Sequence, residues 1–250
     1  MLDISRQDPN YRYITEWFWP FEKLAQAVGI SASDLGELIG AGCGPGAIYA
    51  FSGRYGWWSA LAGHVDGHDG PPPSDAERWF APAAVWGLRR ATLARRRGAS
   101  LEEAARQNAA LFTEEFIEAL ERLPEARFGF ADCFDANGII DTIARARAVE
   151  EWAAWVGGGY AVCLRIFTGE TCVRKESLGA WLKAHIADPE SHPLTAEALL
   201  SICERLAQLM LPFAPWQRPL GTPGVTIDRL IADLGLGAEL PFRGDDELRC

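Results

Sequence analysis

Residues 21–51 read FEKLAQAVGISASDLGELIGAGCGPGAIYAF, a pattern that predicts two short helices joined by a tight turn. A glycine ends the first helix, and Ser31 with Asp34 forms a variant capping box that opens the second. Residues 40–46, rich in glycine, then interrupt regular structure before a short apolar strand at 48–51. Helix, turn, helix and loop in this order predict an N-terminal helix-turn-helix-like module.

The rest of the chain divides at a loop. Residues 64–73 contain two glycines, three prolines and four acidic or histidine side chains in close succession, as is typical of a boundary. We therefore predict an N-terminal helix-turn-helix-like module over residues 1–63 and a helical domain over residues 74–240. Residues 241–250 are polar, and we expect them to form a mobile tail.

The second unit carries several helix signals. Ser74 and Ser100 each begin a capping box, and Pro82 is expected to bend the helix that the first box opens. Apolar residues at helical spacing then recur between breaks at glycine and proline. The helices are expected at 74–97, from 100 to just before Pro124, and at 139–156, 178–187, 195–211 and 224–235.

One segment of this unit has a β pattern. Residues 160–167 and 171–175 are rich in β-branched and aromatic side chains, and three residues with a central glycine separate them. Such a pattern predicts a β-hairpin over residues 160–175. The predicted fold class is therefore mostly α with a small β-hairpin, an N-terminal helix-turn-helix-like module preceding a helical domain.

Composition restricts the partners. Of 250 residues, 24 are Lys or Arg and 34 are Asp or Glu, and the net charge of −10 opposes binding to nucleic acid or anionic membranes. No apolar run reaches the ~18 residues of a membrane span, and no secretory signal begins the chain. The six cysteines form no Cys-x-x-Cys pair, so we expect reduced thiols in a cytoplasmic protein. The ten tryptophans fit either an ordinary core or a pocket for a flat aromatic ligand.

No metal or cofactor motif is present. His64 and His68 lie four residues apart, but glycines break any helix that would bring them to one face. A calcium loop aligned on Gly138 would need oxygen ligands where Cys133 and Ala144 stand. Walker, nucleophile-elbow and zinc-protease motifs do not occur, so we expect no cofactor.

Residues 24–49, LAQAVGISASDLGELIGAGCGPGAIY, resemble the N-terminal reading head of MerR-like regulators. That resemblance implies a transcriptional regulator with a C-terminal ligand-sensing domain. A reading helix normally offers Arg, Lys, Asn or Gln to the bases, whereas this one offers Ser33, Asp34 and Glu37. Because carboxylates repel phosphates, we expect a retained structural, dimerisation or substrate-binding module and no nucleic-acid partner. The regulator remains the alternative function.

Two further stretches, GGYAVCLRIFTGETCVRKES at 158–177 and LPFAPWQRPLGTPGVTIDRLI at 211–231, resemble a bacterial family of unknown function, DUF6058. The resemblance implies a role in natural-product biosynthesis. The layout is also similar to the bacterial Pictet–Spengler β-carboline synthase of the marinacarboline pathway. This second similarity implies a cofactor-independent cyclase that condenses a tryptophan-like amino acid or amine with an aldehyde. A protein that only binds a pathway intermediate is a third possibility.

By position, the synthase resemblance implies that Glu103 is the general base and that Arg78 binds the substrate carboxylate. Trp79 and Trp86 lie beside these positions and are candidates to bind the aromatic ring. The histidine that the resemblance implies between them does not occur in this chain; Leu93 stands in that stretch. We expect an apolar site to raise the pKa of Glu103, although the same residue could simply complete the cap begun by Ser100.

The predicted hairpin supplies the remaining candidates. Alternation along short strands can direct Tyr160, Arg165 and Glu176 to one face, where the first two would bind substrate. Glu176 is the second candidate for the catalytic acid or base. We expect a small aromatic substrate, no membrane partner, and a homodimer, because helix-turn-helix modules of this type commonly pair and tryptophan-rich surfaces need cover.

Overall fold

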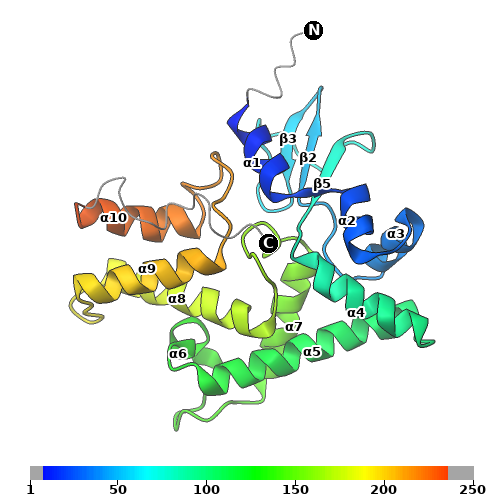
Figure 1. Cartoon of the computed structure of the whole chain (residues 1–250). Helices are drawn as coiled ribbons and strands as arrows, with labels where there is room; N and C mark the ends of the chain where they lie inside the picture. Colours follow the sequence, from blue (N-terminus) through cyan, green and yellow to red (C-terminus); the bar gives the residue numbers. More distant parts are fainter. Residues whose placement is uncertain (1–7, 236–250) are drawn as a thin grey trace.

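The computed structural model describes residues 8–235 and is mostly α-helical, with one small antiparallel sheet near the N-terminus (Figure 1). The predicted class, mostly α with a small β element, is thereby confirmed. The sheet and the first three helices lie at one end of the molecule, and the longer helices form the other end. The predicted mobile tail at 241–250 lies outside the described residues. Among residues 8–235, no helix is long and apolar enough to cross a membrane.

The helix-turn-helix part follows its local signals. Helix α2 (Phe21–Val28) ends at Gly29, whose φ of 82° is in the left-handed region that glycine adopts without strain. Helix α3 (Ala32–Gly40) begins at Ser31, whose hydroxyl accepts a hydrogen bond from the backbone N–H of Asp34. Both helices agree with the sequence prediction. Helix α1 (Pro9–Trp17), capped by Asp8, precedes them.

The sheet contains the predicted strand at 48–51, observed as β2 at 49–52. Its strands follow the order β1-β5-β2-β3-β4, and every pairing is antiparallel. Tyr49 pairs with Trp79 on one neighbouring strand and with Ser59 on the other. The strands are β1 (Trp19–Pro20), β2 (Tyr49–Ser52), β3 (Gly56–Ser59), β4 (Gly63–His64) and β5 (Glu77–Phe80).

The helix predicted from Ser74 is wrong over its first part. Residues 77–80 form strand β5, whose Trp79 and Phe80 are buried against the other strands and helices. Helix α4 (Ala84–Arg96) begins only after Pro82, because a proline ring is tolerated before a helix and not inside it. Residues 77–80 therefore form a strand, because pairing with β2 stabilises it more than the capping signal at Ser74 stabilises a helix.

The remaining helices pack around α5, the longest described helix. It contacts α4, α7 and α8, and α8 in turn contacts α6 and α9 (Figure 1). Short π-helical and 3-10 segments occur at Pro223–Asp228 and Ala131–Cys133. The helices are α5 (Leu101–Arg122), α6 (Ala126–Gly129), α7 (Ile143–Val156), α8 (Gly169–Ala187), α9 (Ala196–Leu209) and α10 (Arg229–Asp233).

The predicted hairpin at 160–175 is wrong. Residues 160–163 form turns, and α8 already begins at Gly169. Thr168 and Thr171 form a capping box in which each side chain bonds the other's backbone N–H, so the supposed hairpin turn is a helix N-terminus. Residues 171–175 are helical despite their β-rich composition, because the cap and the packing against α5 stabilise the helix.

Two apolar clusters hold the fold together. The larger one draws buried residues from both sides of the 64–73 loop, from Tyr13 as far as Ala214. The smaller one joins the end of α8 to α9 and α10. The main core therefore contains residues of both predicted units. The division at 64–73 itself stays a prediction. The five described cysteines are free and buried.

Candidate functional site

Glu103 lies in the first turn of α5 and is exposed, which differs from the partly buried position expected for it. The hydroxyl of Ser100 accepts a hydrogen bond of 3.0 Å from the Glu103 backbone N–H. Within the described residues, no hydrogen bond or ion pair engages the Glu103 carboxylate, so the side chain does not complete the cap. The carboxylate is therefore free to meet a ligand.

A surface hollow of about 510 Å³ lies over this carboxylate. We call it the Glu103 groove. One turn of α5, one face of α4 and the residues that follow α4 form it, and Arg90 of α4 and Arg97 just after it supply two guanidinium groups. Arg90 is half-buried, and its buried Nε has no hydrogen-bond partner within the described part of the chain. The residues that line the groove include Arg90, Leu93, Arg97, Glu103 and Gln107.

This arrangement brings opposite charges into one hollow without pairing them. No ion pair of 4.0 Å or less joins Glu103 to Arg90 or Arg97 among residues 8–235. The Arg90 Nε is buried, but no hydrogen bond engages the terminal guanidinium nitrogens of Arg90 or Arg97 within residues 8–235. The groove can therefore bind an anionic group on its arginines beside a carboxylate that is able to accept a proton.

Arg78 does not share this groove. It lies on β5, half-buried, and one of its terminal nitrogens donates a 2.8 Å hydrogen bond to the carbonyl of Pro73. Strand β5 precedes α4 and Glu103 follows it, and a 13-residue helix rises about 20 Å. Strand β5, which carries Arg78, and the start of α5, which carries Glu103, lie at opposite ends of α4 (Figure 1).

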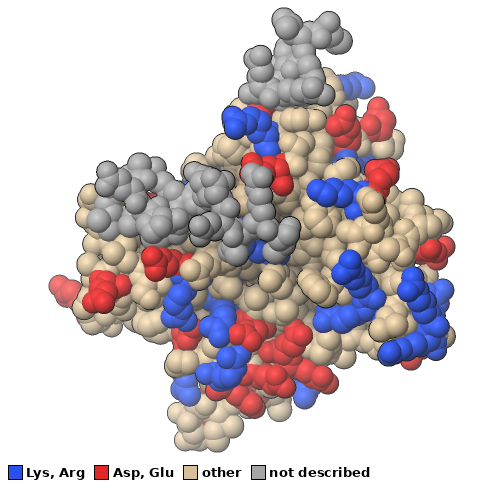
Figure 2. Space-filling view, viewed as in Figure 1, with Lys and Arg blue, Asp and Glu red and all other residues tan. Residues whose placement is uncertain are grey.

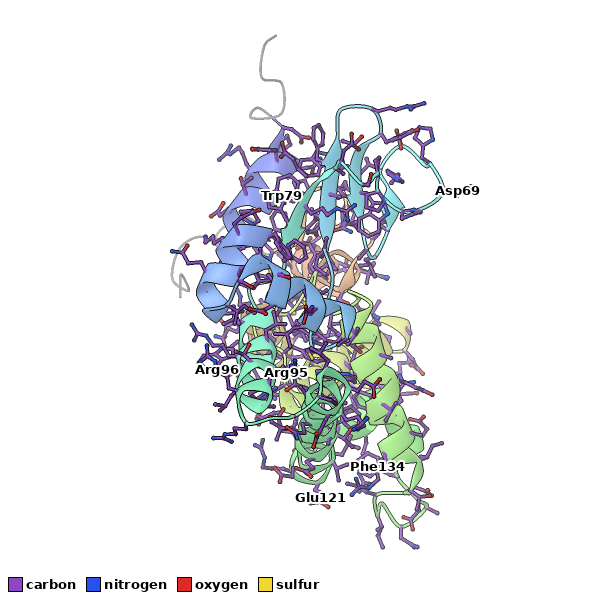
Figure 3. The ribbon with its side chains drawn as sticks, turned by 90° about the vertical axis from the view of Figure 1, so that its right-hand side faces the viewer. Asp69, Trp79, Arg95, Arg96, Glu121 and Phe134 are labelled. Carbon is purple, nitrogen blue, oxygen red and sulfur yellow. The ribbon has the colours of Figure 1, made fainter. Side chains whose placement is uncertain are left out.

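The two tryptophans also separate. Trp79 is 5% exposed, and its ring lies 5.5 Å from Trp57 in an aromatic core below the sheet. Trp86, on the first turn of α4, is 62% exposed, and the guanidinium of Arg89 lies 5.8 Å from its ring. Figure 3 shows Trp79 in the sheet half of the molecule, well away from the far end of α4 that Arg95 and Arg96 mark. Trp79 thus serves the core, and Trp86 is open to a ligand.

Tyr160 and Glu176, which sequence reasoning placed on one hairpin, do come together, although on a turn and a helix. Lys175 joins them, since its ammonium lies 2.5 Å from a Glu176 carboxylate oxygen and 5.2 Å from the Tyr160 ring centre. The Tyr160 hydroxyl donates a hydrogen bond to Glu151, which also pairs with Arg147 at 3.0 Å. We call Arg147, Glu151, Tyr160, Lys175 and Glu176 the Glu151 cluster.

Burial dominates the electrostatics of this cluster. It raises the pKa of Glu151, against the opposing effects of the Tyr160 hydroxyl and the Arg147 guanidinium. Burial raises the pKa of Tyr160 as well, so the phenol stays protonated and donates to Glu151. Sequence reasoning grouped Lys175 with Tyr160 and Glu176 but missed Arg147 and Glu151. The i, i+4 spacing of Arg147 and Glu151 on α7 was a signal, but such pairs are usually solvated.

Arg165 belongs neither to the Glu103 groove nor to the Glu151 cluster. Its guanidinium lies 5.0 Å from the ring centre of Trp17, so it packs the loop before α8 against α1. A cation over an indole face contributes to the packing of these two segments.

The two histidines of the 64–73 loop have ring centres 6.2 Å apart. In the described chain, no group of three or more His, Cys, Asp or Glu residues could hold a metal ion.

A protein-family model described as a family of unknown function (DUF6058) matches residues 108–235. The chain belongs to this family. No curated protein and no solved structure matches it. The DUF6058 part of the predicted resemblance is confirmed, whereas the MerR-like and β-carboline synthase resemblances stay predictions.

The DUF6058 match divides the candidate residues into two sets. It includes Tyr160, Arg165 and Glu176, and with them the whole Glu151 cluster. Four other candidates precede it along the chain, namely Arg78, Trp79, Trp86 and Glu103. The family part of α5 begins at residue 108, directly after Gln107 of the Glu103 groove. The groove therefore lies at the edge of the region that defines DUF6058.

Proposed function

We propose that this DUF6058 protein is a biosynthetic enzyme that condenses a tryptophan-like amino acid or amine with an aldehyde in the Glu103 groove. The observation that carries the proposal is a free carboxylate in one hollow with two unpaired guanidinium groups. The carboxylate is the base that a Pictet–Spengler cyclisation needs, and the guanidinium groups suit a substrate carboxylate. Trp86 does not line the groove, but it is exposed on α4 one turn before Arg90 and suits an indole ring.

The chemistry balances with no redox partner. The substrate amine and the aldehyde lose one water to form an iminium ion. An indole ring carbon attacks the iminium carbon, which forms the new C–C bond and leaves the positive charge on the indole. The Glu103 carboxylate then removes the proton from the substituted ring carbon, so that the ring regains aromaticity, and later releases the proton to water. Nearby negative charge also stabilises the cationic intermediate.

In this groove the substrate carboxylate is proposed to bind Arg90 and Arg97, in place of the Arg78 that the synthase resemblance implies. Arg97 is exposed and Arg90 half-buried, and the terminal nitrogens of both make no hydrogen bond among the described residues. Arg78 lies outside the groove, so a variant of Arg78 is the comparison that tests whether the substrate binds in this groove or elsewhere. A carboxylate bound by two arginines would hold the amine near Glu103, so positioning and charge both contribute to the rate.

The test measures product stereochemistry and rate with tryptophan or tryptamine and a simple aldehyde. The uncatalysed reaction of tryptamine gives a racemate, whereas the enzyme should give one enantiomer, resolved by chiral chromatography with mass detection. Glu103→Gln should lower kcat by about 10²–10⁴ with the melting temperature unchanged, since the cap uses only its backbone N–H. Glu102→Gln is the matched control, because Glu102 is exposed on the same turn and does not line the groove.

Three outcomes would count against parts of this proposal. A racemic product formed at the uncatalysed rate excludes the cyclase. Loss of turnover in Glu176→Gln with none in Glu103→Gln moves the base to the Glu151 cluster, inside the family region. Substrate binding without any turnover points to a protein that only binds a pathway intermediate. Arg97→Ala and Arg78→Ala are compared by KM, and the larger increase identifies the carboxylate anchor.

A MerR-like regulator is the second candidate, favoured by one observation. Helices α2 and α3 are followed directly by the β2–β3 hairpin, which is the element order of a winged helix-turn-helix. The exposed side of α3 carries Asp34 and Glu37 and no basic residue, which opposes contact with phosphates. Retention on heparin that falls steeply with salt would favour the regulator; elution at low salt would favour the enzyme.

A further inference from the structure

A second hollow lies on the other side of α4, between the helix-turn-helix part and the start of α5. Its volume is about 760 Å³, within the range of small-molecule sites. We call it the Arg96 groove. Figure 3 shows Arg95 and Arg96 at the far end of α4, below the helices of the N-terminal module. Adjacent arginines thus serve different hollows, since Arg96 lines this groove and Arg97 lines the Glu103 groove.

The two walls of the Arg96 groove carry opposite charges. Asp34 and Glu37 line it from α3, and Arg95 and Arg96 line it from α4. Apolar side chains from three elements complete the lining, namely Ile30, Leu38 and Leu101. A ligand that fits all three features would need an anionic group, a cationic group and an apolar body.

The charges do not neutralise one another across the groove. No ion pair of 4.0 Å or less joins the acidic wall to the basic wall among the described residues. One terminal nitrogen of Arg95 donates a 2.8 Å hydrogen bond to the Ala99 carbonyl oxygen, and within residues 8–235 no other acceptor bonds the guanidinium. Asp34 accepts a 2.7 Å hydrogen bond from the Ser31 hydroxyl, and within residues 8–235 no side chain bonds the charged groups of Glu37 and Arg96.

Other ligand classes fit less well. Nucleic acid and simple anions would suit the arginines, but the two carboxylates on the opposite wall would repel them. A simple amine would suit the carboxylates and be repelled by the guanidinium groups. A purely apolar ligand would leave both charged walls unused. Only a zwitterion with an apolar body pairs with every part of the lining.

We propose that the Arg96 groove binds a free α-amino acid with an apolar or aromatic side chain, as its zwitterion. The carboxylate binds Arg95 and Arg96, whose planar guanidinium groups suit bidentate bonds to it. The ammonium group binds Asp34 and Glu37. The side chain lies against the apolar part of the lining. This binding site is separate from the proposed catalytic groove and needs no turnover.

Isothermal titration without any aldehyde tests the site, with three probes that differ in one charge each. L-Tryptophan carries both charges, tryptamine lacks the carboxylate, and indole-3-propionate lacks the ammonium. The protein carries Arg97→Gln, which removes an anchor of the Glu103 groove and isolates the Arg96 groove. We expect tryptophan to bind, and each single-charge analogue to bind at least roughly tenfold more weakly, because each loses a charged hydrogen-bond pair.

Adding Arg96→Gln or Glu37→Gln to this background should weaken tryptophan binding by roughly tenfold or more. Both side chains are exposed and, within the described chain, unpartnered, so melting temperatures should not change. Three results would overturn the inference: no binding at ~10 mM tryptophan, equal binding of all three probes, or unchanged binding in both added variants. Tryptophan binding that Arg97→Gln alone abolishes would overturn it while supporting the proposed function.

Discussion

At the scale of single residues, Gly169 shows how closely two helices approach. It is the first residue of α8, and a Cβ placed on it would lie 2.5 Å from the Phe112 carbonyl oxygen and nearer still to the Phe116 nitrogen. Both partners are backbone atoms of α5 and cannot rotate away. The requirement for glycine here is one of space, because the backbone of Gly169 is not in the left-handed region.

Gly169→Ala should therefore destabilise the protein by about 1–3 kcal/mol or more, the usual cost of overpacking a tight contact. Gly36→Ala is the matched control, since Gly36 lies inside α3 with open space around its missing Cβ. Alanine there should stabilise the fold by up to about 1 kcal/mol through helix propensity. Urea unfolding of both variants checks the contrast, and equal midpoints would contradict it.

The same residue explains one failure of sequence reasoning. A glycine between two β-rich runs predicts a hairpin turn, and nothing local reveals that α5 will lie against it. The caps at Ser31 and Ser100 could be predicted because cap and helix are neighbours in sequence. The free carboxylate of Glu103 could not, since the same motif allows the full capping box.

At the scale of elements, Glu170 clamps α8 to α5. Its two carboxylate oxygens pair with Arg174 at 2.7 Å and with Arg122, in the last turn of α5, at 2.6 Å. The hydrogen bonds from Arg174 and Arg122 lower the pKa of Glu170 below its ordinary value of 4.5. The clamp therefore stabilises the folded state above pH 4.5, and its contribution is lost as the pH falls through the lowered value.

Glu170→Gln should reduce the free energy of unfolding at pH 7 and flatten its decline between about pH 5 and pH 3. The effect should be modest, because the Glu170 side chain is 40% exposed and water screens the pairs. Glu121→Gln is the control, since Glu121 lies beside Arg122 and makes no ion pair within residues 8–235. Urea titrations across this pH range check it; parallel pH profiles for both variants would contradict it.

Most helices could be predicted, whereas the sheet largely could not. Helices α2, α3 and α5 can be predicted from periodicity, caps and glycine stops that lie within a few residues of one another in the sequence. Strand β5 exists because Trp79 pairs with Tyr49, thirty residues earlier, and that partner is invisible to local patterns. The α7 part of the Glu151 cluster was missed for the same reason, since Glu151 meets Tyr160 and Cys172 only when α7 lies against the segment that leads into α8.

At the scale of the whole molecule, α4 presents an uncovered stripe. Trp86, Arg90, Leu93 and Arg97 recur at helical spacing and share one face. Two of them are large apolar side chains, and Trp86 is 62% and Leu93 47% exposed. Basic side chains gather over the far end of the same helix (Figure 2). A mixed apolar and arginine-rich surface of this kind is typical of protein interfaces.

The predicted homodimer can therefore be tested at this stripe. Light scattering at micromolar concentration should give twice the 27.4 kDa of one chain. The double substitution Trp86→Glu and Leu93→Glu should give a monomer, because two carboxylates would replace the apolar contacts at an interface. Leu61→Glu is the control, since Leu61 is also exposed, at 53%, but lies beside the sheet between β3 and β4.

A wild-type mass of one chain would contradict the dimer, and a dimer that survives the double substitution would place its interface elsewhere. Because Leu93 lines the Glu103 groove and Trp86 is a proposed substrate contact, the double substitution removes parts of the proposed site as well, so the mass measured by light scattering, and not turnover, is the readout for the dimer.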